Sequence, residues 1–311
     1  MTDPEGQFDE GMRLLAVPNQ GQRGVELIEA AADAGHAQAM ERCAVFECMG
    51  VLRAIDWHKC FSRLRDAANA GSIDARRQLI LFAEDRSDEV ADAAPKDAID
   101  PQRLFRPATP TRLRERPMML SVDRIASSAE CAWLIEVARR RLEVAFVNDP
   151  ATGRRVADPA RTNRGAAFPV DQTDCVIELI RQRLSLVIGI PVQCFEVSQV
   201  LHYDPGQEFK PHHDYLEPNA EGYREELNRN GQRIATALVY LNQDYEGGGT
   251  QFPKLGVTHR GKTGDALIFA NVDPAGRGDP QTLHAGLPPT RGEKWIFSQW
   301  IREHPPGMGN P

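Results

Sequence analysis

The residues of this chain best suited to chemistry are two histidines and an aspartate. His212 and Asp214 lie in the segment YDPGQEFKPHHDY, and His284 follows in TLHAG. Side chains alternate between the two faces of a β-strand, so a strand here would point His212 and Asp214 the same way and His213 the other way. Two imidazoles and one carboxylate with open positions form the facial triad that suits non-heme Fe(II) centres. The spacing therefore predicts an iron site.

The motifs around these residues resemble those of the prolyl 4-hydroxylase branch of the Fe(II)- and 2-oxoglutarate-dependent dioxygenases. The family pattern Y-x-x-G-Q-x-Y-x-x-H-x-D is met at five positions: Tyr203, Gly206, Gln207, His212 and Asp214. Four segments follow in the family's order: EGGGTQFP at 246–253, GDALIF at 264–269, DPQTLHAG at 279–286 and RGEKW at 291–295. The resemblance covers residues 118–303 and departs from the pattern at Phe209, where the family has a tyrosine.

The resemblance implies three groups of site residues. The iron ligands would be His212, Asp214 and His284. The partners of the distal carboxylate of 2-oxoglutarate would be Tyr203, Thr250 and Lys294. The substrate contacts would be Arg161, Arg233 and Trp300. Fe(II), 2-oxoglutarate and dioxygen would be required, with ascorbate as the reductant.

The chemistry of such a site explains the need for Lys294. Two imidazoles and a carboxylate leave open positions on Fe(II), of which 2-oxoglutarate can fill two and dioxygen one. A cation must then hold the far carboxylate. Lys294 lies in the apolar, aromatic segment GEKWIFSQW, which is typical of a strand, so its ammonium group would be paired with a desolvated carboxylate. Because Asp214 occupies the position that a halide would need, halogenation is not expected.

The composition is that of a soluble globular protein with room for two domains, because 41% of the 311 residues are hydrophobic and 26% are charged. The net charge of −7 argues against a nucleic-acid partner. The sequence contains no apolar run long enough for a membrane span, and it begins with the acidic MTDPEGQFDE. We therefore expect a cytoplasmic protein. Its six cysteines form no C-x-x-C pair, so we expect small buried hydrophobes and neither disulfides nor a zinc site.

A repeat occupies the first hundred residues. AADAGH at 31–36 and AANAGS at 67–72 are offset by 36 residues, with small residues where two helices could approach and a glycine to end the first helix. This pattern resembles Sel1-type relatives of the tetratricopeptide repeats, with an extra helix at 8–17. Two units are few for a free-standing solenoid, so they should pack on the catalytic domain or on a second copy, which leaves oligomerisation open. They could bind a protein or peptide substrate or act as a structural cap.

The order of expected elements indicates an α+β protein. We expect a small all-α helical-repeat domain at 1–95, a linker at 96–115 and a catalytic domain at 116–304. In the catalytic domain, helices at 128–142, with a capping box at Ser127 and Glu130, and at 173–188 accompany strands at 118–122, 197–203, 234–241, 266–269 and 295–301. This order favours a double-stranded β-helix, or jelly roll, buttressed by helices. Two long polar loops, at 148–165 and 216–231, are expected to cover a binding site.

The sequence thus predicts a hydroxylase of a proline or another residue in a peptide or protein, which couples decarboxylation of 2-oxoglutarate to succinate and carbon dioxide with C–H hydroxylation. One alternative is hydroxylation of a free amino acid or small molecule. Another is a repeat-based protein-binding module whose oxygenase domain is inert. Intact ligand types at all the matched positions count against the second alternative.

Overall fold

The computed structural model describes residues 3–83, 99–106, 108–149, 151–156 and 159–305. The chain divides into two compact units. The helical unit comprises Met1–Arg106 and Phe168–Gln182, and the sheet unit comprises Pro107–Ala167 and Arg183–Pro311. Of the linker expected at 96–115, residues 96–98 and 107 lie outside the described residues, and the described part contains a short helix at 101–104 and a strand at 111–114. Residues 168–182, which the sequence placed in the catalytic domain, make their contacts within the helical unit.

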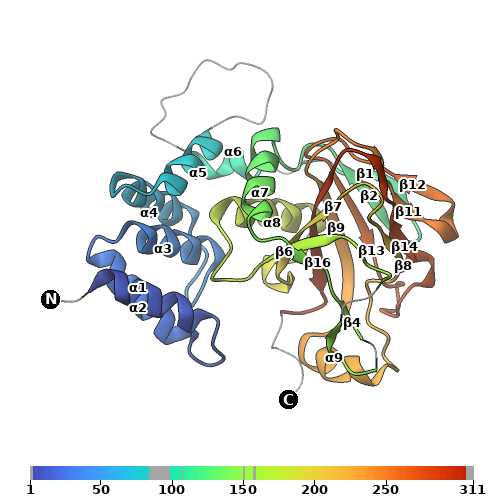
Figure 1. Ribbon diagram of the computed structural model, residues 1–311, viewed down its shortest axis with the longest axis horizontal. Coiled ribbons are helices and arrows are strands. Elements are labelled where there is room, and N and C mark those ends of the chain that lie inside the picture. Colours follow the sequence, from blue (N-terminus) through green and yellow to red (C-terminus); the bar gives the residue numbers. More distant parts are fainter. Residues whose placement is uncertain (1–2, 84–98, 107, 150, 157–158, 306–311) are drawn as a thin grey trace. The chain divides into compact units, whose positions relative to one another are not determined.

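The helical unit contains a leading helix, two helix pairs and the short helix α6 (Figure 1). Its helices are α1 (Pro4–Leu15), α2 (Gly21–Asp33), α3 (Ala37–Met49), α4 (Trp57–Asn69), α5 (Ile73–Ala83) and α6 (Pro101–Leu104). Helix α4 repeats α2 and α5 repeats α3 at the offset of 36 residues seen in the sequence. Gly35 and Gly71 follow α2 and α4 with φ of 94° and 105°, the left-handed conformation that ends helices. The repeat is therefore structural, whereas its assignment to the Sel1 type stays a prediction.

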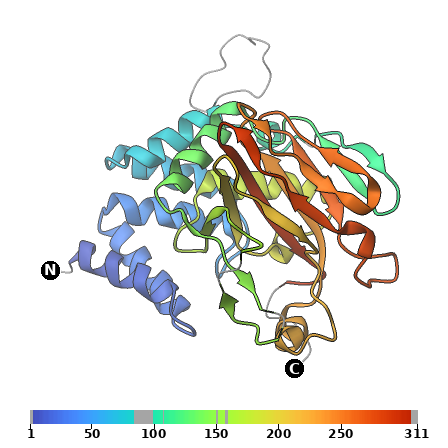
Figure 2. The same ribbon diagram turned by 45° about the vertical axis from the view of Figure 1, so that its right-hand side comes forward.

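The sheet unit contains most of the strands, in two main sheets (Figures 1 and 2). The larger sheet follows the order β1-β2-β13-β9-β16-β7-β6-β3. Its strands are β1 (Thr111–Arg114), β2 (Met119–Val122), β3 (Glu143–Val144), β6 (Arg164–Phe168), β7 (Ser198–Tyr203), β9 (Arg233–Tyr240), β13 (Ala266–Ala270) and β16 (Lys294–Arg302). The smaller sheet follows β12-β11-β14-β8. Its strands are β8 (Phe209–His212), β11 (Thr250–Phe252), β12 (Val257–His259) and β14 (His284–Gly286).

The remaining elements are short or flank the sheets. Two ribbons pair β4 (Val147–Asn148) with β5 (Arg155–Val156) and β10 (Glu246–Gly247) with β15 (Pro289–Arg291). The helices are α7 (Ser128–Arg139), α8 (Cys175–Ile188), α9 (Arg224–Asn230) and the 3-10 turns η1 (Val192–Cys194), η2 (Glu221–Tyr223), η3 (Pro253–Leu255) and η4 (Pro280–Thr282). The capping box predicted at Ser127 and Glu130 is present at the start of α7. No helix in the described part of the chain is long and apolar enough to cross a membrane.

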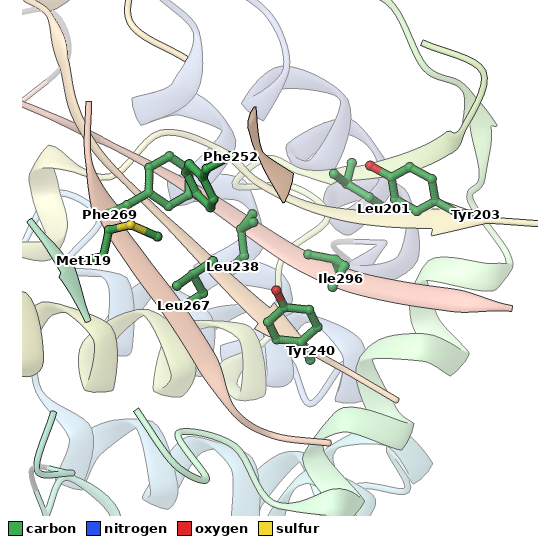
Figure 3. Close-up of a cluster of buried hydrophobic side chains, with 9 residues drawn as sticks. All are labelled: Met119, Leu201, Tyr203, Leu238, Tyr240, Phe252, Leu267, Phe269 and Ile296. Carbon is green, nitrogen blue, oxygen red and sulfur yellow. The ribbon is translucent and has the colours of Figure 1, made fainter. Parts of the chain in front are cut away.

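Apolar side chains from both main sheets pack into one core, which confirms the predicted jelly roll (Figure 3). Phe252 of the smaller sheet meets Phe269 of the larger one edge to face, with ring centroids 5.1 Å apart. The core also includes Met119, Leu201, Tyr203, Leu238, Tyr240, Leu267 and Ile296. Burial of each large apolar side chain contributes roughly 1.5–3 kcal/mol. This core holds the smaller sheet, which has only short strands, against the larger one.

The two long loops lie side by side (Figures 1 and 2). A Cβ atom on Gly153, in the turn between β4 and β5, would come within 2.5 Å of the Gly222 carbonyl oxygen in η2. Gly153 also has a φ of 68°, so the contact needs glycine for both space and conformation. The second loop contains the short helices η2 and α9.

Candidate active site

The three expected iron ligands meet between two strands of the smaller sheet. His212 ends β8 and lies directly opposite His284, the first residue of β14, in the antiparallel register. The Nε2 atom of His212 is 3.7 Å from Asp214 Oδ1, and the Nε2 atom of His284 is 3.5 Å from Asp214 Oδ2. All three ligand atoms lie within 4.8 Å of one another. These separations exceed good hydrogen bonds and suit three atoms that share a metal ion.

Strand alternation explains only part of the difference between His212 and His213. Strand β8 ends at His212, and Asp214 lies in a bend, so simple strand alternation does not bring His212 and Asp214 together. The bend turns the Asp214 carboxylate back toward both imidazoles. His213 points elsewhere, with its Nε2 atom 3.3 Å from the carbonyl oxygen of Pro280. The structure therefore leaves His213 out of the cluster, as the sequence predicted.

Backbone carbonyls fix the tautomers of both histidines. His212 Nδ1 lies 2.8 Å from the carbonyl oxygen of Lys210, and His284 Nδ1 lies 3.0 Å from that of Thr282. A carbonyl oxygen can only accept, so each Nδ1 must donate, and each Nε2 keeps its lone pair for a metal. Burial, reinforced by the neighbouring His284, lowers the pKa of His212 to about 3. His212 is therefore neutral at physiological pH, as a ligand must be.

Asp214 is held on its outer side by a polar relay. Thr236 of β9 donates to Asp214 Oδ2 at 2.7 Å, and Asn271 donates to the Thr236 hydroxyl at 2.9 Å. Burial opposes ionisation of Asp214, but the two nearby imidazoles and the bond from Thr236 hold its pKa below the ordinary value. The one local signal of this relay is a threonine within the largely apolar strand RIATALVY. The donor set of one carboxylate and two neutral imidazoles fits Fe(II).

A cavity in the sheet unit joins this cluster to nearly all the other expected site residues. It is lined by Arg161, Leu201, Tyr203, Phe209, His212, Asp214, Leu238, Thr250, His284, Gly286, Lys294, Ile296, Ser298 and Trp300. Residues far apart in the sequence therefore share one cavity. Of the nine predicted site residues, only Arg233 is missing from its wall.

The predicted cosubstrate residues come from both main sheets. Lys294 begins β16 and pairs in register with Tyr203 at the end of β7, with its ammonium nitrogen 4.8 Å from the centre of the Tyr203 ring. Thr250 lies on β11, and its hydroxyl is 3.0 Å from that of Tyr240, a residue that the sequence did not single out. Burial lowers the pKa of Lys294 to about 7, and the side chain is 1% exposed. A bound carboxylate would relieve this desolvation.

Arg233 does not line the cavity, and its predicted contact with the substrate stays a prediction. Its guanidinium group donates two hydrogen bonds to Glu196, at 2.6 and 3.0 Å, and lies 3.7 Å from the centre of the Trp300 ring. Glu196 is also 2.6 Å from Arg302. Burial opposes ionisation of Glu196, but the two arginines hold its pKa below the ordinary value. Arg233 thus braces Trp300 from behind, while Trp300 itself lines the cavity.

Phe209, which stands where the family has a tyrosine, stacks on one histidine of the metal cluster. The Phe209 ring lies parallel to His212, with centroids 3.5 Å apart and an interplanar angle of 15°. The Arg161 guanidinium lies 4.6 Å from the centre of the Phe209 ring. Arg161 is held by the Asn163 side chain at 3.2 Å and by the Phe146 carbonyl at 3.0 Å. The wall next to His212 is therefore apolar and rigid, with no hydroxyl from position 209.

Comparison with known proteins agrees with this site. The family described as the 2OG-Fe(II) oxygenase superfamily matches residues 198–302. Prolyl 4-hydroxylase 1 of Arabidopsis thaliana is 35% identical over 201 residues, which cover 60% of this chain and 69% of the relative. The prolyl 4-hydroxylase subunit alpha-1 of Rattus norvegicus is 31% identical over 204 residues, which cover 66% of this chain and 38% of that subunit.

A solved structure is also similar. The viral collagen prolyl hydroxylase from Paramecium Bursaria Chlorella virus-1, in complex with 2OG, has a TM-score of 0.45 and 29% identity, over 59% of this chain and 94% of that one. By its sequence relatives, the chain belongs to the prolyl 4-hydroxylase family of 2-oxoglutarate- and Fe(II)-dependent oxygenases.

Single alanine substitutions should separate the ligands from their neighbour. His212→Ala, Asp214→Ala and His284→Ala each remove a donor of the cluster, so Fe(II) binding should weaken and turnover should be lost. His213→Ala should keep iron bound, because its ring faces Pro280. Anaerobic Fe(II) titration of the four variants checks this. Loss of iron in His213→Ala together with retention in His212→Ala would contradict the assignment.

Lys294→Met should weaken 2-oxoglutarate binding far more than iron binding. Removing one partner of a buried charge pair costs about 3–5 kcal/mol, or roughly two to three orders of magnitude in affinity. Calorimetric titration of 2-oxoglutarate into the Fe(II)-loaded protein without oxygen measures the effect. Equal affinity in the two proteins would remove Lys294 from the cosubstrate site.

The affinity for 2-oxoglutarate in the same titration should change with pH in one direction only. Below about pH 7 Lys294 is already charged, and above it a bound carboxylate must recruit a proton, because the carboxylate raises the pKa of the ammonium group. The affinity for 2-oxoglutarate should therefore fall as pH rises above about 7, by up to about tenfold per pH unit. Lys294→Met should show no such proton uptake when two buffers of different ionisation enthalpy are compared.

Proposed function

We propose that this chain is a Fe(II)- and 2-oxoglutarate-dependent dioxygenase that hydroxylates proline in a peptide or protein. Decarboxylation of 2-oxoglutarate to succinate and carbon dioxide would accompany C–H hydroxylation. The observation that carries the proposal is one cavity lined by the His212, Asp214 and His284 cluster and by buried Lys294. Membership of the prolyl 4-hydroxylase family supports the same reaction.

The residues of the cavity have separate tasks in this proposal. Bound iron would supply the activation of dioxygen. His212, Asp214 and His284 would hold it, each oriented from its outer side by a carbonyl or by Thr236. Lys294 would hold the distal carboxylate of 2-oxoglutarate. Because Lys294 is almost fully buried, this attraction acts in a low dielectric environment and is stronger than in water.

The apolar part of the cavity lining suits a small aliphatic ring. Trp300 supplies an aromatic surface, and Leu238 and Ile296 supply aliphatic walls. Proline is the residue whose side chain forms such a ring, and the relatives named above are prolyl hydroxylases. Arg161 lies at the same cavity and could bind a backbone carbonyl of an extended peptide. These features favour a peptidyl proline over a charged free amino acid.

We further propose three features that accompany this activity. Ascorbate would serve as the reductant, and the protein would act in the cytoplasm. The helix pairs of the helical unit would recognise a protein or peptide partner, because Ile73 and Ile80 of α5 are 74% and 54% exposed and lie seven residues apart on one helix face.

Mass spectrometry of proline-containing peptides after incubation with protein, Fe(II), 2-oxoglutarate and ascorbate tests the reaction. We expect a product heavier by one oxygen atom, located at proline by fragmentation, with one succinate formed per product. The His212→Ala variant is the control and should form neither. Oxygen addition to free amino acids alone would favour the small-molecule alternative, and iron binding without any succinate would favour an inert domain.

The contact between Arg233 and Trp300, with Arg233 held by Glu196, leads to a second prediction about this reaction. Glu196→Gln removes the charge that holds Arg233 under Trp300, so we expect KM for the peptide to rise about tenfold, equivalent to about 1.4 kcal/mol. Iron affinity and KM for 2-oxoglutarate should stay unchanged, and Glu196→Asp should recover part of the loss. Glu303→Gln, at an exposed carboxylate three residues after Trp300, is the control. An unchanged peptide KM would show that Trp300 needs no such support.

A further inference from the structure

Three cysteines that are far apart in the sequence meet inside the helical unit. Cys48 lies in α3, Cys60 in α4, and Cys175 is the first residue of α8. None of the three is exposed to solvent. Their sulfur atoms all lie within 4.8 Å of one another, and those of Cys60 and Cys175 are 3.6 Å apart. The sequence predicted isolated buried thiols, so this cluster is a product of the fold.

The spacing of the sulfur atoms fits a shared metal ion. An ion bonded at about 2.3 Å to three sulfurs in a plane holds those sulfurs about 4 Å apart. The cluster is close to this geometry before any ion is added. The three cysteines are free thiols, since the 3.6 Å separation of Cys60 and Cys175 is far above the roughly 2 Å of a disulfide.

Two of the three sulfur atoms lie at the N-terminal ends of helices. Cys175 begins α8 and Cys60 lies in the first turn of α4, where the positive end of a helix dipole stabilises a thiolate. Buried Arg42 donates to the carbonyl oxygens of Val170 and Thr173, just before Cys175.

Cys48 instead lies in the last turn of α3, next to buried Glu47. Each of the three thiols would lose its proton on binding a metal ion.

We propose that Cys48, Cys60 and Cys175 form a three-thiolate site for a soft metal ion, separate from the His212, Asp214 and His284 centre. Thiolates select soft ions such as Cu(I), whereas structural zinc takes four ligands. Within the described ranges, no histidine or carboxylate joins the three sulfurs at the same spacing. The site therefore favours Cu(I) in three-coordinate form. Bound metal would tie α3, α4 and residues 168–182 together and would stabilise the helical unit.

Anaerobic titration of the reduced full-length chain with Cu(I), in competition with a chromogenic Cu(I) chelator, tests the proposal. We expect one tightly held copper per chain and a thiolate-to-copper charge-transfer band, which the nitrogen and oxygen donors of the iron centre cannot give. Because the thiols are buried, the titration is repeated on protein refolded from urea with Cu(I) present. No band under either condition would overturn the proposal, as would tetrahedral zinc as the ion retained.

Matched cysteine variants locate the ion. Cys60→Ser and Cys175→Ser should lower copper affinity at least about 100-fold and remove the rise in Tm on copper binding. Cys43→Ser and Cys131→Ser, at buried cysteines outside the cluster, should bind as the unaltered chain does. If a serine variant does not fold, Cys60→Ala takes its place. Undiminished copper binding in the folded cluster variants would contradict the site.

Discussion

The site depends on one constraint: a negatively charged carboxylate and two neutral imidazoles must converge without closing the space for a metal ion between them. His212 and His284 are kept apart from Asp214 because each group is bonded on its far side. The imidazoles are held by the backbone carbonyls of Lys210 and Thr282, each two residues before its histidine, and the carboxylate is held by Thr236. The lone pairs therefore point to a common centre before any metal is bound. Such outer hydrogen bonds set ligand orientation and basicity.

The two sheets are needed because these ligands and their supports come from different layers. His212 and His284 lie on the smaller sheet, whereas Thr236 and Lys294 lie on the larger one. The apolar core of Figure 3 fixes the distance between the layers. It also removes Lys294 from water, which lowers the pKa of its ammonium group and prepares it for an anionic cosubstrate. Packing and chemistry are thus set by the same side chains.

In the helical unit, segments that pack together are not all consecutive in the sequence. Residues 168–182 lie between strands of the sheet unit in the sequence but make their contacts with the helical unit. Gln78 accepts a hydrogen bond from the Cys175 backbone at 3.0 Å, and Arg42 holds the preceding turn. The chain therefore passes through the helical unit twice. Removing the first hundred residues would leave this returning segment without its buried partners, so a truncation is a poor test of what the repeats do.

The sequence by itself determined the ligand types, the larger-sheet strands β2, β7, β9, β13 and β16, and the repeat of 36 residues, because these features are local and periodic. It did not determine β11 and β14, which are three residues long and carry no periodic signal. The bend at Asp214, the brace of Arg233 and Glu196 behind Trp300, and the meeting of three cysteines were decided only by tertiary structure. Each of these features joins residues that are distant in the sequence or depends on the local backbone geometry. No local sequence pattern encodes such features, because close packing of the whole chain sets them.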